Sequence, residues 1–110
     1  MRGIWLSIPA AAAAALTGCA TIYDLDNRRP DGRYVSQRSM AELAGCVSSG
    51  MRNLGPVDTE RGDGFTRLIL RTQAGNPAAI ATVRATAGGS NVSVRQTINY
   101  SLGPVIQRCL

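Results

Sequence analysis

The sequence predicts a small α+β domain in which one helix packs on an antiparallel sheet of three to four strands, closed by one disulfide. Three observations favour this fold class. One stretch near the middle of the chain has the periodicity of an amphipathic helix. The second half alternates between apolar and polar residues, and one cysteine stands in the helical stretch and another near the end of the chain.

The helix is expected over residues 39–54. Ser39 followed three residues later by Glu42 has the form of a capping box. Apolar residues then recur at intervals of three or four, on the same side as Cys46: Met40, Leu43, Val47, Met51 and Leu54. A Gly-Pro pair ends the segment. A domain this small needs such a face for its core, although an apolar helix face also suits a groove for a partner.

Three strands are expected at residues 65–72, 78–86 and 91–100, separated by turns rich in glycine and asparagine. Residues 33–37 are short enough to form a fourth, edge strand. Alternation of period two describes a sheet with one buried and one wet face. The predicted buried face consists of Thr66, Leu68, Leu70, Ala79, Ala81, Val83, Ala85, Val92, Val94, Ile98 and Tyr100.

The predicted wet face carries four arginines: Arg67, Arg71, Arg84 and Arg95. Guanidinium groups bind phosphates and carboxylates with two parallel hydrogen bonds, so these residues form a candidate face for an anionic partner. The alternative is that they only keep the sheet soluble. The other residues expected on this face are Phe65, Ile69, Ile80, Thr82, Ser93, Thr97 and Asn99.

Residues 56–64 are predicted to form a solvated loop, and residues 105–110 a short helical turn that carries Cys109. The acidic residues of the loop do not have the spacing of a calcium-binding loop, because Gly62 stands where the third ligand is needed. No metal site is therefore expected there.

The first 18 residues have the layout of a secretory signal peptide. Arg2 is the only charged residue before Asp24, and the long apolar run that follows it ends in the small residues Thr17 and Gly18. The run is shorter than the roughly 20 apolar residues that a membrane-spanning helix needs, and Pro9 interrupts it. We expect export rather than a buried helix.

The four residues Leu16-Thr17-Gly18-Cys19 resemble the lipobox of bacterial lipoproteins. The resemblance implies that the Cys19 thiol is joined to a diacylglycerol, that a signal peptidase cuts before it, and that the new amino group is acylated. Two or more acyl chains make attachment to a bilayer stable. Ala20 follows the cysteine, where aspartate implies retention at the inner membrane. The resemblance therefore implies an anchor in the outer membrane, with the domain facing the periplasm.

The layout of the rest of the chain is similar to that of small envelope lipoproteins of proteobacteria. The shared features are the lipobox, a short strand, a serine-capped helix with a cysteine, a meander and a C-terminal cysteine. This resemblance implies no activity. It divides the chain into a signal peptide at 1–18, a lipidated N-terminus and tether at 19–32, and a small α+β domain at 33–110.

Export places Cys46 and Cys109 in an oxidising compartment, where two thiols usually form a disulfide. A loop of this length stabilises the fold by about 4 kcal/mol in the chain-entropy model. That is as much as the core of a very small domain supplies, about 3–5 kcal/mol. Two cysteines without histidine cannot complete a tetrahedral zinc site, so the metal alternative is disfavoured.

All 12 basic residues are arginine, and they outnumber the 7 acidic ones, which gives a formal net charge of +5. Removal of the signal peptide lowers this by one charge. The balance permits attraction to anionic lipid headgroups or to nucleic acid, and the expected partner is anionic lipid or an envelope protein. A GC-rich genome also explains an arginine-only composition. Nucleic acid is not expected, because the protein is exported and has few aromatic residues for stacking.

The sequence favours a membrane-anchored lipoprotein with a non-catalytic structural or binding role. The alternative is a small inhibitor or regulator of an envelope enzyme. Catalysis is a remote alternative, because the chain has no histidine and the carboxylates lie in predicted loops. No catalytic residue, cofactor or metal is predicted.

Overall fold

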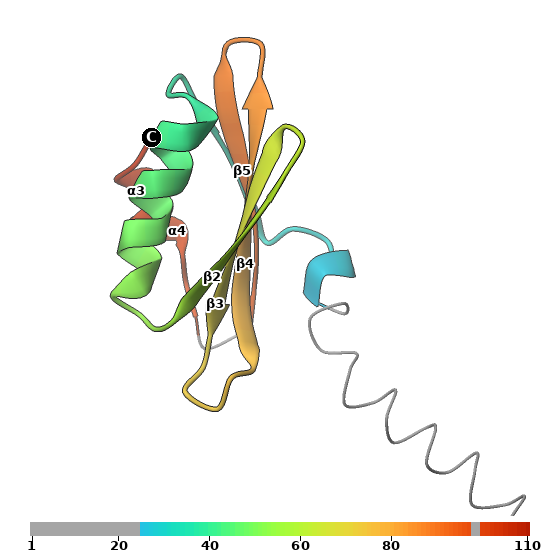
Figure 1. The fold of residues 1–110 in the computed structure, drawn as a ribbon, viewed down its shortest axis with the longest axis vertical. Helices are drawn as coiled ribbons and strands as arrows, with labels where there is room; N and C mark the ends of the chain where they lie inside the picture. The colour runs from blue at the N-terminus through green and yellow to red at the C-terminus, as the bar shows by residue number, and fades with distance from the viewer. Residues whose placement is uncertain (1–24, 98–99) are drawn as a thin grey trace, which may run out of the picture.

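An antiparallel sheet with helices on one face organises the chain (Figure 1). The computed structural model describes residues 25–97 and 100–110. A helical turn at residues 25–27 comes first. The elements that follow are β1 (Gly32–Ser36), α3 (Met40–Arg52), β2 (Val57–Gly62), β3 (Phe65–Arg71), β4 (Pro77–Thr86), β5 (Gly89–Gln96) and α4 (Gly103–Gln107).

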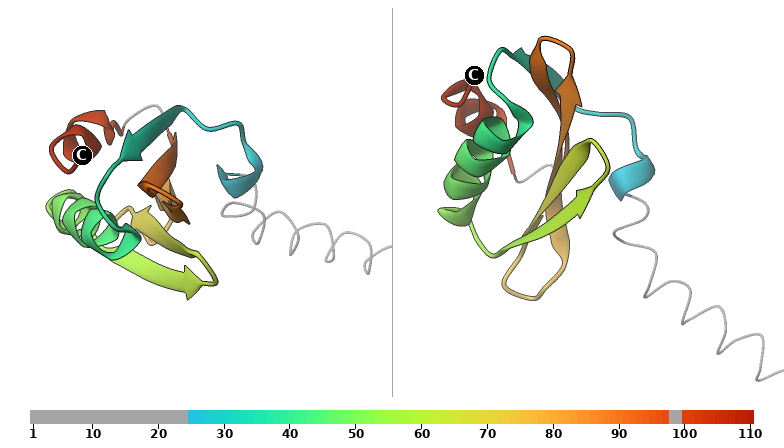
Figure 2. Two further views of the ribbon diagram at one scale, coloured as in Figure 1. Left: turned by 90° about the horizontal axis from the view of Figure 1, so that it is seen from above. Right: turned by 45° about the horizontal axis from the view of Figure 1, so that its top comes forward.

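The five strands lie in the order β1-β5-β4-β3-β2, and every neighbouring pair is antiparallel. The strands from β2 to β5 form a meander, whereas β1 adds to the far edge beside β5. α3 therefore connects the two edges and crosses one face of the sheet. Figure 2 shows α3 and α4 together on that face, which we call the inner face. The N-terminal segment, residues 25–31, runs from β1 to the opposite face, which we call the outer face.

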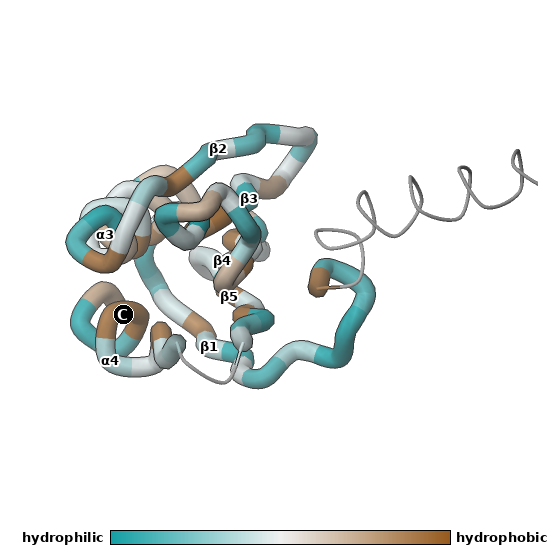
Figure 3. The backbone as a smooth tube through the Cα atoms, turned by 90° about the horizontal axis from the view of Figure 1, so that it is seen from below, coloured by the Kyte–Doolittle hydropathy of each residue, from teal (hydrophilic) through white to brown (hydrophobic). Residues whose placement is uncertain are grey.

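The predicted antiparallel sheet, its helix layer and the disulfide are confirmed, but the sheet is larger than predicted and the fold is mostly β. The additional strand is β2, which lies within the predicted loop 56–64. It pairs with β3 from Val57 opposite Leu70 to Gly62 opposite Phe65. The prediction of a loop was wrong because β2 is a largely hydrophilic edge strand, exposed except at Val57, and so lacks apolar alternation (Figure 3).

The start of α3 is as predicted. The Ser39 hydroxyl accepts a hydrogen bond from the Glu42 backbone N–H at 3.2 Å. It also donates one to the Glu42 carboxylate at 3.1 Å. Ser39 is thus the N-cap, and it satisfies a backbone donor that has no partner inside the helix.

The end of α3 differs from the prediction. The helix ends at Arg52, and the next residues tighten into a turn in which the Leu54 N–H donates to the Met51 carbonyl. Leu54 therefore lies beyond the helix, and 49% of it is exposed. The prediction that Leu54 contributes to the core was wrong. Its spacing from Met51 fits the helical pattern, but the helix ends before it is reached.

The main core lies between the inner face of the sheet and the two helices. Its fully buried large side chains are Leu43, Val47, Met51, Leu68, Leu70, Val83, Val92, Leu102 and Ile106. The Cys46–Cys109 disulfide joins α3 to the segment that follows α4. The two cysteines are 63 positions apart in the sequence, and their Cα atoms are 5.7 Å apart. This bond holds the C-terminal segment against the core.

The strand predicted at 91–100 is displaced. β5 begins at Gly89 and ends at Gln96, and the Tyr100 N–H donates to the Thr97 carbonyl instead of to a neighbouring strand. Residues 98–99 of that prediction lie outside the described residues. Ala85 was also predicted to be buried but is exposed, because the β4–β5 hairpin extends past the end of β3.

The outer face is less wet than predicted. Ile69 and Ile80 are buried there under Leu25, and the three form a second, small apolar cluster. Leu25 belongs to the predicted tether, so this residue of the tether packs on the sheet, whereas residues 27–29 are exposed. This contact depends on a residue far from the strands in sequence, which is why alternation alone could not predict it.

Gly89, at the β4–β5 turn, provides a test of the contact between this turn and the end of β1. Its φ is +153°, and an added Cβ would overlap the Ser36 and Gln37 backbone of the β1 end. We expect Gly89→Ala to lower the free energy of unfolding by about 1–3 kcal/mol, measured by urea denaturation. Gly88→Ala is the matched control, because nothing lies within 4 Å of its Cβ position. Equal midpoints for the two variants would contradict the described contact.

Candidate functional site

The four arginines of the predicted anionic-partner face all lie on the outer face of the sheet. Arg67 and Arg71 alternate with the buried Ile69 on β3. The register then places Arg95 beside Ile80 and Arg84 beside Phe65. Their common face is therefore as predicted, but their surroundings differ.

Arg67 and Arg71 are ion-paired. Arg67 binds the carboxylates of Glu60 on β2 and of Asp26 in the N-terminal turn, the latter at 2.7 Å. Arg71 pairs with Asp58, also on β2. Only 25% and 26% of the two arginine side chains are exposed, so both are half-buried on the face that was predicted to be wet. Such pairs contribute little stability, but they neutralise this half of the face.

The other half of the face is cationic. Arg84 and Arg95 lie with Arg33 of β1 around a hollow of about 380 Å³, which we call the cationic hollow. Among residues 25–97 and 100–110, none of the three forms an ion pair. Arg95 is held in place by a hydrogen bond of 2.6 Å from its Nε to the Arg28 carbonyl. Three positive charges thus share one concave surface.

Arg33 is the member of this cluster that sequence reasoning missed. It stands at the start of the predicted edge strand, but the sequence does not show which strand this edge adds to. The register places Arg33 beside Ser93, so β1 lies next to β5, 60 positions away along the chain. The signal in the sequence was that Arg33 and Val35 stand two positions apart, on the side of the strand opposite Tyr34. In the structure Tyr34 packs against the main core, and Val35 is 79% exposed.

The chemistry of the cationic hollow is that of an anion-binding surface. A guanidinium group stays protonated at any physiological pH and presents its N–H donors in a planar fork. Ser93 and Asn91, which also line the hollow, add polar side chains. Such a surface suits phosphate or carboxylate groups.

The other predicted site residues lie elsewhere. Cys46 and Cys109 form the disulfide on the inner face, away from the cationic hollow. Cys19 lies outside the described residues. Within residues 25–97 and 100–110 there is no group of three or more metal-ligating side chains, and no helix has both the length and the apolar character needed to cross a bilayer.

Comparison with protein-family models, with curated protein sequences and with solved structures gives no match. What the cationic hollow can bind follows from its own chemistry and from its position relative to the N-terminal segment.

Proposed function

We propose that this protein is a lipid-anchored envelope lipoprotein with a non-catalytic binding role, and that the cationic hollow binds anionic headgroups at the surface of the outer membrane. The observation that carries the proposal is the clustering of Arg33, Arg84 and Arg95 on the outer face of the sheet. The N-terminal turn at residues 25–27 lies on this same side (Figure 1). The lipobox motif at Cys19 supports the anchor.

The chain length between anchor and domain favours this orientation. Leu25 is buried on the outer face, beside Ile80, which is the cross-strand neighbour of Arg95. Leu25 follows Cys19 by six positions, and a fully extended chain spans at most about 22 Å over six steps. A lipidated Cys19 therefore keeps the outer face near the bilayer surface, where anionic lipids attract arginine.

The proposal predicts salt-sensitive binding to anionic vesicles. A form beginning at Ala20 should bind vesicles that contain phosphatidylglycerol more tightly than vesicles of phosphatidylcholine alone. Each arginine near such a surface contributes about 1 kcal/mol, so Arg33→Gln/Arg84→Gln/Arg95→Gln should weaken binding on the order of 100-fold at low salt. Co-sedimentation measures this, and the binding should weaken towards 0.15 M salt, where the Debye length is about 8 Å.

The matched control changes the same number of charges elsewhere. Arg38, Arg52 and Arg108 are exposed and do not line the cationic hollow. Replacing these three by glutamine should weaken vesicle binding far less. An equal loss in both triple variants would mean that net charge alone attracts the protein, and the proposed site would be wrong.

A further inference from the structure

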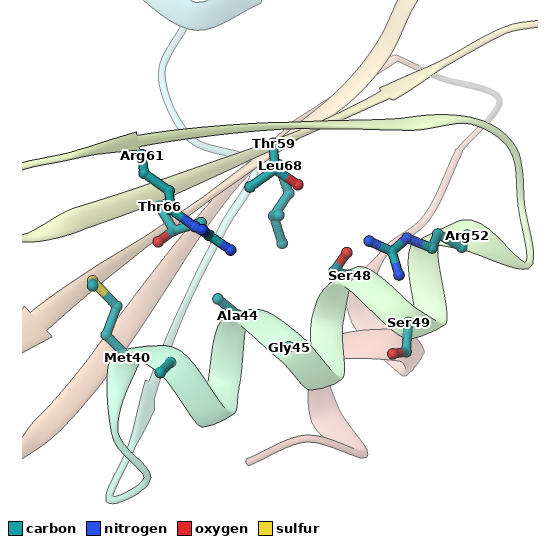
Figure 4. Close-up of a pocket in the computed structure, with 11 residues that line it drawn as sticks. Met40, Ala44, Gly45, Ser48, Ser49, Arg52, Thr59, Arg61, Thr66 and Leu68 are labelled. Atoms are coloured by element: carbon teal, nitrogen blue, oxygen red, sulfur yellow. The ribbon is translucent and has the colours of Figure 1, made fainter.

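A second hollow lies on the opposite side of the sheet from the cationic hollow. It is a groove of about 430 Å³ between α3 and the β2–β3 hairpin, which we call the inner groove (Figure 4). Apolar side chains such as Met40 and Leu68 line part of it, and hydroxyls and two arginines line the rest. Its volume lies within the range of about 300–1,000 Å³ that is typical of ligand sites.

The Ser48 hydroxyl is the first sign of a ligand in this groove. Ser48 is only 6% exposed, and its Oγ has no hydrogen-bond partner within the described part of the chain. A buried hydroxyl without a partner costs about 1–3 kcal/mol, so such groups are rare in native proteins. Figure 4 shows this hydroxyl pointing from α3 into the groove, where a bound group can accept its hydrogen bond.

Two arginines define the charge that the groove accepts. Arg52 lies one helical turn after Ser48 on α3, and Arg61 extends from β2 on the other wall (Figure 4). Neither forms an ion pair within residues 25–97 and 100–110. Two unpaired guanidinium groups and a free hydroxyl donor in one groove favour an anionic group.

The wall of the groove is also an open sheet edge. β2 is the last strand in the sheet order and pairs only with β3 in the described structure. The Arg71 N–H donates to the Pro56 carbonyl at 2.9 Å, which identifies residues 56 and 71 as a hydrogen-bonded pair of the ladder. Because such pairs alternate along an antiparallel ladder, residues 57, 59 and 61 turn their backbone N–H and C=O groups towards the open edge.

The open edge and the inner groove belong together. The side chains of Thr59 and Arg61 line the groove, and the backbone groups of these same residues are those directed to the open edge. A strand that pairs with this edge would therefore place alternate side chains against the α3 side of the sheet. This arrangement is suited to recognition of an extended peptide by strand addition.

We propose that β2 binds an extended peptide segment as a sixth strand, and that a carboxylate of this peptide enters the inner groove to meet Arg52, Arg61 and Ser48. A peptide fits this surface better than a free anion does, because only a peptide uses both the open backbone groups and the groove. This inference does not depend on the lipid anchor or on the cationic hollow, since it concerns the other face of the sheet.

The test uses the full chain in detergent micelles and fluorescence anisotropy. The probe is fluorescein-labelled Thr-Val-Thr-Glu-Thr-Val, and its twin carries glutamine in place of glutamate. We expect the glutamate peptide to bind about tenfold more tightly than the twin. Arg52→Gln/Arg61→Gln should bring this ratio close to one. A ratio near one for the unmodified chain would overturn the proposal.

A second variant tests whether the peptide pairs with the open edge of β2. Thr59→Pro removes an N–H that faces the open edge, so it leaves the β2–β3 ladder intact, and proline is tolerated at such edge positions. It should weaken binding of the glutamate peptide at least about tenfold, whereas Thr59→Ala, which keeps the N–H, should change it little. Thermal unfolding checks that both variants fold. Tight binding by a folded Thr59→Pro variant would rule out strand addition.

Ser48→Ala separates binding from stability. Removing a hydroxyl that has no partner should leave the unfolding midpoint unchanged or higher, while the glutamate peptide should bind about 2–10-fold more weakly. Unchanged binding would contradict the role of Ser48.

Sedimentation velocity tests a different occupant of the β2 edge, a second copy of this chain. Concentration-dependent dimers that Thr59→Pro abolishes, together with no peptide binding, would show that the edge pairs with a second copy. This result would overturn the peptide proposal.

Discussion

Cys46→Ala/Cys109→Ala is expected to lower the free energy of unfolding by about 4 kcal/mol. The disulfide closes a loop with a sequence separation of 63 residues, and removing the bond restores that loop's freedom to the unfolded chain. For a domain of this size the loss corresponds to a decrease in melting temperature of about 15–30 °C. Alanine is the suitable substitute because Cys109 is 2% exposed and serine would bury a new hydroxyl there.

Calorimetry or urea denaturation of a form beginning at Ala20 measures this change. The unmodified form in the presence of reductant is the control, and its midpoint should fall to about that of the double variant. Alkylation and mass spectrometry of the native protein without reductant should find both thiols protected. Two freely alkylated cysteines would contradict the disulfide and its stabilising role.

Cys19→Ser should abolish lipid attachment completely. Only a thiol can form the thioether of a lipoprotein anchor, so the expected effect is a total loss and not a partial one. Cells fed a palmitate analogue should label the unmodified protein, and the variant should remain as unprocessed, unlabelled precursor. Without acyl chains and processing, the variant should also be missing from the outer-membrane fraction.

Cys46→Ser and Cys109→Ser are the matched controls for this experiment, since each removes one thiol without touching the lipobox. Both should still incorporate the palmitate analogue. Label that persists on the Cys19→Ser variant would refute the anchor, and the proposed orientation at the membrane would lose its basis.

In the proposed arrangement the two faces of the sheet have different partners. The outer face carries the cationic hollow and the attachment of the N-terminal segment, so it faces the bilayer. The inner groove and the open edge of β2 then face away from the membrane, where a peptide from an envelope protein can reach them. A protein with these two surfaces would hold its peptide partner close to the membrane.

Local features of the fold could be predicted from the sequence because each depends on neighbouring residues. The serine cap of α3, its apolar face and the alternation in β3 and β4 follow from periodicity over a few positions. The pairing of Cys46 with Cys109 was predictable as well, because only two cysteines remain after Cys19. The candidate anchor likewise depends on four consecutive residues.

Contacts between distant segments were decided only by the tertiary structure. β2 has no apolar alternation and is a strand only because β3 pairs with it, and its carboxylates then neutralise Arg67 and Arg71. Arg33 joins Arg84 and Arg95 because β1 adds to β5 rather than to the other edge. Four arginines on one face were thus determined by the sequence alone. Which of them remain free to bind an anion depends on the charges that distant strands bring beside them.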